Sequence, residues 1–147
     1  MKSILRTDTG DWGALAARIF LGIVILPHGL QKLLGMFGGG GFSGTVDFFV
    51  GMGIPAVVAV LIILGESFGS LMLIFGFISR LAAASIGIIM AGAALMVHVP
   101  NGFFMNWMGN QAGEGYEYHL LAIGLALVVI IRGGGAFSVD GAITDGR

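Results

Sequence analysis

Residues 54–78 read IPAVVAVLIILGESFGSLMLIFGFI, an apolar run of about 25 residues whose one charged side chain, Glu66, lies near its centre. A helix needs roughly 20 mainly apolar residues to cross about 30 Å of hydrocarbon. The run therefore predicts a helix that spans a membrane and carries an acid close to the bilayer midplane.

Three further apolar runs accompany this segment. The run over 13–34 is the most polar, and Pro27 within it predicts a kink. The last run is strictly apolar only over 120–131, so its helix must extend beyond these bounds. We expect an all-α integral membrane protein, a four-transmembrane-helix bundle that forms one domain over 1–147, with spans at about 13–34, 54–78, 81–99 and 117–133.

The composition supports a lipid environment and excludes several function classes. The 147 residues are 56% hydrophobic and 10% charged, whereas a soluble domain carries about 25% charged residues. A net charge of −1 without a basic run argues against nucleic-acid binding. Because the chain has no cysteine, it has no disulfide, iron–sulfur or thiol redox chemistry of its own. Any redox role must use a cofactor or a partner.

The basic residues predict the orientation in the membrane. Lys32 is alone on one side of the expected bundle, and the side of the termini holds Lys2, Arg6, Arg18, Arg80, Arg132 and Arg147. By the positive-inside rule, both termini are cytoplasmic and the loops 35–53 and 100–115 lie outside. The N-terminal region has no small-residue cleavage site, so we expect it to be retained.

Glu66 needs a partner, a proton or water, because an ionised group near the midplane costs about 2.5 to 3.5 kcal/mol. Arg18, on the first span, is the candidate we favour for a structural ion pair with Glu66. A role of Glu66 in proton relay or ligand contact, and a protonated, packed Glu66, are the alternatives.

Several polar side chains gather toward the outer ends of the spans: His28, Lys32, His98, Glu117, Tyr118 and His119. Together with Glu66 they predict a shallow, outward-facing ligand-binding pocket roofed by the two aromatic loops. The alternative is that each of these side chains extends separately to the membrane–water interface. We expect no metal site, since the spacing of His98, Glu117 and His119 matches no known signature. A haem b held by His28 and His98 is the rival to an organic ligand.

The pattern does not decide which face of the fourth helix packs against the bundle. Glu117, Leu121, Gly124 and Val128 form one stripe, and His119, Ala122 and Ala126 form another. In the second helix, Gly65 and Gly69 flank Glu66 and predict that the acid lies close to a neighbouring backbone.

The sequence resembles the DoxX family of small four-helix bacterial membrane proteins. The motifs that carry the resemblance are Arg18-Ile-Phe-Leu-Gly22, His28-Gly-Leu-Gln-Lys32, Gly53-Ile-Pro55, Glu66 with Gly69, Arg80-Leu-Ala-Ala, His98 with Asn101-Gly-Phe-Phe104, Gly115-Tyr-Glu117-Tyr118 and Gly133-Gly-Gly-Ala-Phe-Ser-Val-Asp140. The resemblance implies a bacterial inner membrane location and a link to thiosulfate or quinone chemistry and to redox enzymes. One departure is Gly134, where relatives often have proline, so the turn is expected to be looser.

Three functions follow as hypotheses. The first is a quinone-linked or redox-linked membrane subunit that acts with an oxidoreductase partner, since a quinone headgroup needs donors and titratable groups. The second is a structural or assembly subunit that docks a larger membrane complex, or a homo-oligomer, without its own ligand. The third is a small transporter of a solute or protons. Whether the chain is an enzyme by itself stays undecided.

Overall fold

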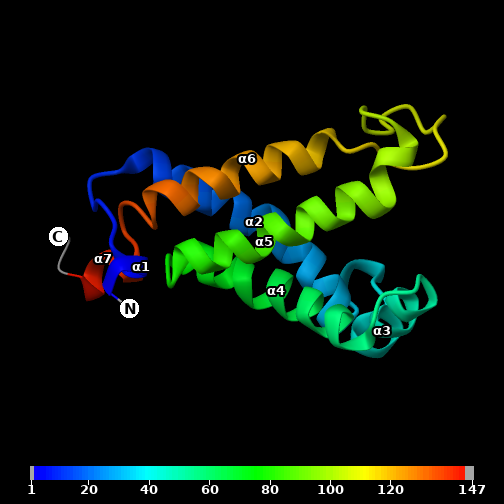
Figure 1. The fold of residues 1–147 in the computed structure, drawn as a ribbon, viewed down its shortest axis with the longest axis horizontal. Coiled ribbons are helices and arrows are strands. Elements are labelled where there is room, and N and C mark those ends of the chain that lie inside the picture. The colour runs from blue at the N-terminus through cyan, green and yellow to red at the C-terminus, as the bar shows by residue number, and fades with distance from the viewer. Residues whose placement is uncertain (1, 145–147) are drawn as a thin grey trace.

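The computed structural model describes residues 2–144, and this part of the chain is helical without any strand (Figure 1). Four long helices run side by side: α2 (Trp12–Leu34), α4 (Ala56–Phe75), α5 (Ser79–Ala93) and α6 (Glu117–Arg132). The all-α, four-helix prediction is confirmed. Arg147, one of the residues used for the orientation, lies outside the described residues.

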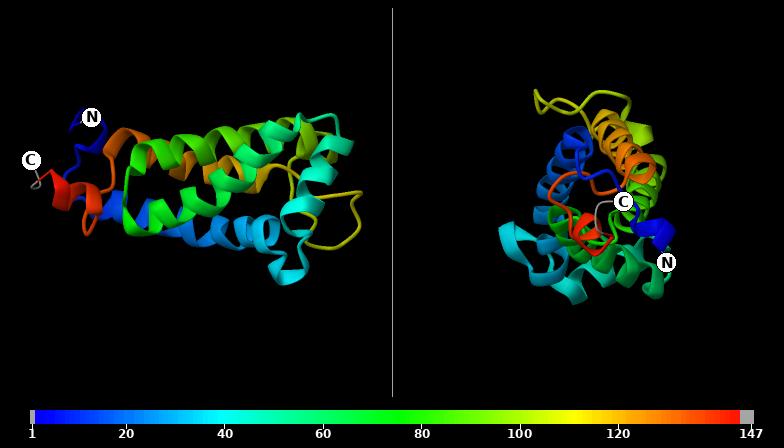
Figure 2. Two further views of the ribbon diagram at one scale, coloured as in Figure 1. Left: turned by 90° about the horizontal axis from the view of Figure 1, so that it is seen from below. Right: turned by 90° about the vertical axis from the view of Figure 1, so that its left-hand side faces the viewer.

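The four helices form a closed ring in which α4 packs on α2, α5 on α4, and α6 on both α5 and α2. Figure 2 shows this ring along its length. Large apolar side chains cover its outside, such as Leu121 at 71% exposure and Ile88 at 73%. Helices that are apolar on their outer faces need lipid around them.

Short elements occupy the two ends of the ring. One end, the terminal end, holds α1 (Lys2–Leu5) and α7 (Val139–Ile143). The other, the loop end, holds η1 (Met36–Gly38), α3 (Gly41–Gly51) and the loop 102–116 (Figure 2).

The helix lengths agree with membrane crossing for three of the four helices. Trp12–Leu34, Ala56–Phe75 and Ser79–Asn101 are long and apolar enough to span a bilayer. The third of these combines α5 with a π turn, η2 (Ala94–His98), and a 3₁₀ turn, η3 (Val99–Asn101). With 16 residues, α6 rises roughly 24 Å at 1.5 Å per residue, which is short of the hydrocarbon thickness.

Two glycines of α2 let it approach α4 closely. A Cβ on Gly29 would lie 2.7 Å from backbone atoms of Ser67, and one on Gly22 would lie 2.9 Å from the carbonyl of Ser70. The hydroxyl of Ser67 donates to the Gly29 carbonyl at 3.0 Å. Such small-residue contacts fix the register of two helices. They also place Glu66, the neighbour of Ser67, against α2.

Candidate functional site

Glu66 forms a buried ion pair with Lys32. The Nζ of Lys32, in the last turn of α2, lies 2.6 Å from the Oε2 of Glu66, in the middle of α4. The Lys32 side chain is 24% exposed and that of Glu66 is 4% exposed. The contact between Gly29 and Ser67, one helical turn away, sets the register that brings the two charges together.

The predicted ion pair between Arg18 and Glu66 is therefore wrong. Arg18 is 1% exposed, and its donors bond instead to backbone carbonyls. These bonds run from Nε to Gly134 (2.6 Å), from Nη1 to Leu73 (3.0 Å) and Ile74 (2.6 Å), and from Nη2 to Ala136 (2.9 Å) and Phe137 (2.9 Å). The last carbonyls of a helix have no partner within the helix and carry partial negative charge. Arg18 donates to two carbonyls in the last turn of α4. It also holds the segment that follows α6, through three carbonyls of that segment.

Asp140 contributes to the terminal end a role that could not be predicted from its motif alone. Its carboxylate accepts from the backbone N–H of Ile78 at 2.7 Å, and from the backbone N–H and hydroxyl of Ser79 at 2.8 and 2.7 Å. These are the first donors of α5, so Asp140 caps that helix from a distant segment. The turn at Gly134 is tightly packed, since a Cβ there would lie 2.8 Å from the Ser79 hydroxyl.

A row of four aromatic side chains crosses the loop half of the bundle, and we call it the histidine row: His28, Tyr118, His119 and His98. The ring centroids are 6.3 Å apart for His28 and Tyr118, 5.3 Å for Tyr118 and His119, and 4.1 Å for His119 and His98. The row joins α2, α6 and the π turn that ends α5.

Two polar atoms of the row are buried without a protein partner. They are the Nδ1 of His119 and the hydroxyl of Tyr118. Within the described residues, one other buried side-chain atom, Nε of Arg80, shares this condition. A buried polar group without a hydrogen bond costs about 1–3 kcal/mol. The row therefore favours a water or a ligand that supplies the missing bonds.

One face of α6 packs against the inside of the bundle. His119, Ala122, Ala126 and Val129 are buried, whereas Leu121 is exposed on the outside of the bundle. The stripe that begins at His119 is the one that faces the bundle.

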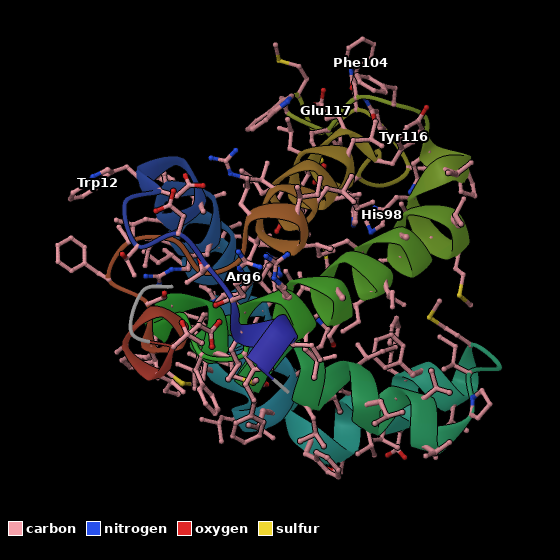
Figure 3. All side chains as sticks on the ribbon, turned by 60° about the vertical axis from the view of Figure 1, so that its left-hand side comes forward. Arg6, Trp12, His98, Phe104, Tyr116 and Glu117 are labelled. Carbon is pink, nitrogen blue, oxygen red and sulfur yellow. The ribbon has the colours of Figure 1, made fainter. Side chains whose placement is uncertain are left out.

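Glu117 lies on the other side of α6 and supports the loop. Its Oε1 accepts from the backbone N–H of Met105 at 2.9 Å and from the indole N–H of Trp107 at 3.4 Å. Figure 3 shows Glu117 beside the loop that carries Phe104, with His98 lower, between α5 and α6. The Nδ1 of His98 bonds to the carbonyl of Glu114 at 2.8 Å. The loop is thus tied to both helices.

The structure shows where the histidines considered for a haem or a metal lie. His28 contacts Tyr118 and His98 contacts His119, so these two histidines are the end members of the histidine row. Among the residues that the structure describes, no three His, Asp or Glu side chains gather closely enough to hold a metal ion. His98 and His119 touch, but Glu117 is turned toward the loop.

A hollow of about 440 Å³ lies next to the ion pair, and we call it the Lys32 hollow. It is lined by Gln31, Lys32, Gly39, Gly40, Gly44, Thr45, Phe48 and Phe49. Of the residues expected around one outward-facing cavity, Lys32 lines this hollow, and His28, His98 and Glu117 do not. The polar groups of the loop end thus form three separate sets. They are the Lys32 hollow with its ion pair, the histidine row, and Glu117 with the loop residues that bond to it.

A lipid-facing ring of four helices with charged groups buried inside defines a small integral membrane protein. The sequence model of the DoxX family matches residues 13–99, which include His28, Lys32, Glu66 and His98. The chain belongs to the DoxX family.

Two relatives extend the match over most of the chain. A Bacillus subtilis (strain 168) protein named "Putative oxidoreductase CatD" is 30% identical over 117 residues, 80% of this chain and 78% of the relative. The "Inner membrane protein YqjF" of Escherichia coli (strain K12) is 31% identical over 130 residues, 88% of this chain and 91% of the relative. No solved structure matches the chain.

Proposed function

We propose that this protein is a quinone-linked membrane subunit that acts with an oxidoreductase partner. The observation that carries the proposal is the histidine row, in which Tyr118 and His119 hold buried polar atoms without protein partners. A phenol and an imidazole both donate and accept hydrogen bonds, which suits the two carbonyl oxygens of a quinone.

The chemistry requires a partner. Reduction of a quinone to a quinol takes two electrons and two protons, and imidazole and carboxyl groups transfer protons. The chain has no cysteine, and the described residues form no metal centre, so the proposal assigns the electrons to another protein. The name of the Bacillus subtilis relative supports a redox connection.

The proposal places the protein in a bacterial inner membrane with both termini in the cytoplasm. The name of the Escherichia coli relative supports the membrane. The orientation rests on Arg6, Arg80 and Arg132, which lie at the terminal end, because cytoplasmic ends carry an excess of Lys and Arg. The ion pair and the histidine row then belong to the outer half of the bundle.

Quinone binding by the purified protein tests the proposal. Protein extracted in mild detergent is analysed by mass spectrometry for retained quinone, and a short-chain benzoquinone is titrated while tryptophan fluorescence is followed. We expect saturable binding that Tyr118→Phe weakens about fivefold, the effect of one hydrogen bond of about 1 kcal/mol.

The matched control is Tyr116→Phe, which removes the hydroxyl of the other tyrosine. Tyr116 packs against Phe103 in the loop, outside the histidine row, so this variant should bind like the parent. Absence of both retained quinone and saturable binding refutes the proposal and favours an assembly subunit. Equal losses in both variants would show that the row does not contact the ligand.

A further inference from the structure

Two phenylalanines at opposite ends of the bundle combine a left-handed backbone with an exposed ring. Phe37, in η1, has φ 54° and is 66% exposed, and Phe137, in the turn before α7, has φ 51° and is 79% exposed. A left-handed backbone brings Cβ close to the following carbonyl oxygen, so it is unfavourable for residues other than glycine. We propose that both rings bind the interfacial layer of a lipid bilayer, one ring at each face of the membrane.

The fold explains the backbone conformation at these two positions but not the aromatic rings. The carbonyl of Phe137 accepts from Nη2 of Arg18 at 2.9 Å, and the carbonyl of Phe37 accepts from the side-chain amide of Gln31 at 3.4 Å. A glycine would offer the same carbonyls without the steric cost. Because each ring is mostly exposed, packing within the protein offsets little of that cost.

The length of α2 relates the two rings to the thickness of a bilayer. Trp12 begins α2, and its ring centroid lies 5.5 Å from that of Phe137 in an edge-to-face contact. Phe37 lies just beyond the other end of α2, which ends at Leu34. The 23 residues of α2 rise roughly 34 Å at 1.5 Å per residue, which is close to the hydrocarbon thickness of about 30 Å. The two rings therefore lie at levels that suit the two interfaces of one membrane.

The surface of α2 between these levels is apolar, and charged groups flank it at the terminal end. Phe20 and Leu34 are 64% and 63% exposed. Asp11, next to Trp12, pairs with Arg132, whose side chain is 60% exposed. Figure 3 shows Trp12 pointing away from the bundle. Aromatic rings between an apolar surface and charged groups are typical of the membrane–water interface.

A bilayer accounts for both rings, whereas a protein partner on one side of the membrane would reach Phe37 or Phe137 but not both. The apolar outside of the four helices is continuous with each ring, so the same lipid can contact all three surfaces. Aromatic residues at the interfaces help to set the tilt and rotation of a membrane helix, and α2 carries His28 and Lys32. The inference does not depend on quinone binding.

Depth-dependent quenching of tryptophan fluorescence tests the proposal. The two native tryptophans, Trp12 and Trp107, are replaced by phenylalanine, so that one introduced tryptophan reports its own depth. Phe37→Trp and Phe137→Trp are reconstituted separately into phosphatidylcholine vesicles whose acyl chains carry bromine either near the headgroup or near the chain end. Phe68→Trp is the matched control, because Phe68 lies near the middle of α4 and is 52% exposed.

We expect Phe37→Trp and Phe137→Trp to be quenched about twofold more by bromine near the headgroup than by bromine near the chain end, because interfacial aromatic rings lie at the headgroup level. Phe68→Trp should show the reverse order. Quenching of either interfacial variant by aqueous iodide but by neither lipid would refute the proposal, since that ring would then lie in water. Protection from iodide and from both lipids would indicate a protein contact and overturn the proposal too.

The single variant Trp107→Phe covers the case in which a substitution at Phe37 or Phe137 prevents folding. It retains both phenylalanines and leaves Trp12 as the one tryptophan. Because Trp12 contacts Phe137, its fluorescence should be quenched more by bromine near the headgroup. Stronger quenching by bromine near the chain end, or quenching by iodide alone, would overturn the proposal, which requires an interfacial ring at both ends.

Discussion

Replacement of Arg18 by methionine should destabilise the protein more than any other single loss of charge at the terminal end. Methionine keeps the apolar stem and removes the guanidinium, so five backbone carbonyls lose a hydrogen bond, although that of Leu73 still accepts from the backbone N–H of Gly76 at 3.1 Å. Three of the five bonds, to Leu73, Gly134 and Ala136, are buried, and the other two are part-buried.

The magnitude follows from the two buried carbonyls that are left without a donor, those of Gly134 and Ala136. Each unsatisfied group costs about 1–3 kcal/mol, which gives roughly 2–6 kcal/mol before the segment relaxes. We expect about 4 kcal/mol. For a chain of this size, about 2–4 °C in unfolding temperature accompanies each kcal/mol, so the transition should fall by roughly 8–16 °C.

The assay is thermal unfolding in detergent, followed by circular dichroism, with Arg132→Met as the control. Arg132 pairs with Asp11 at 2.6 Å, but its side chain is 60% exposed, and exposed pairs contribute about 0–1 kcal/mol. An Arg18→Met protein as stable as Arg132→Met would refute the role assigned to the five bonds. In a double-mutant cycle, Arg18→Met and Glu66→Gln should be additive within about 0.5 kcal/mol. A coupling energy well above this value would instead indicate an ion pair between Arg18 and Glu66.

Three further predictions follow from the same structure. Lys32→Met should cost about 3–5 kcal/mol because it leaves a buried carboxylate unpaired, and adding Glu66→Gln should recover most of that loss in the same unfolding assay. The backbone N–H of Ala14, together with Arg132, lowers the pKa of Asp11 below its ordinary value of 3.8. The contribution of Asp11 to stability is therefore complete above that value and is lost as the pH falls through the lower, folded-state pKa; acid unfolding of Asp11→Asn should lack this component, and an unchanged acid profile would contradict it. A reporter active only in the cytoplasm should be active when fused to the C-terminus, and activity of a periplasm-only reporter there would reverse the orientation.

The sequence predicted α2 and α4 because each is an apolar run about as long as a membrane crossing requires. The run over 13–34 corresponds to α2 over Trp12–Leu34, and the run over 54–78 corresponds to α4 over Ala56–Phe75. Apolar run length reports the need to bury the backbone in lipid, and that need belongs to each segment separately. It does not depend on how the helices pack.

The partners of the buried charges could not be predicted in the same way. The partners of Arg18 are backbone carbonyls, which leave no trace in the side-chain sequence. The pairing of Lys32 with Glu66 depends on the register of α2 against α4, which Gly29 sets through its contact with Ser67. A glycine one turn before a basic residue is a weak signal for that register in a chain with 27 glycines.

The two ends of the bundle differ in how their buried polar groups are bonded, and this difference supports the proposed site at the loop end. At the terminal end, every donor of Arg18 and both carboxylate oxygens of Asp140 have protein partners, and the exception among the described residues there is the Nε of Arg80. At the loop end, the hydroxyl of Tyr118 and the Nδ1 of His119 have none within the described chain. Satisfied groups stabilise a fold by themselves, whereas unsatisfied buried groups cost stability until something binds them. The bonds of Arg18 and Asp140 therefore stabilise the terminal end, and the unsatisfied atoms of Tyr118 and His119 support the proposal that a ligand binds at the loop end.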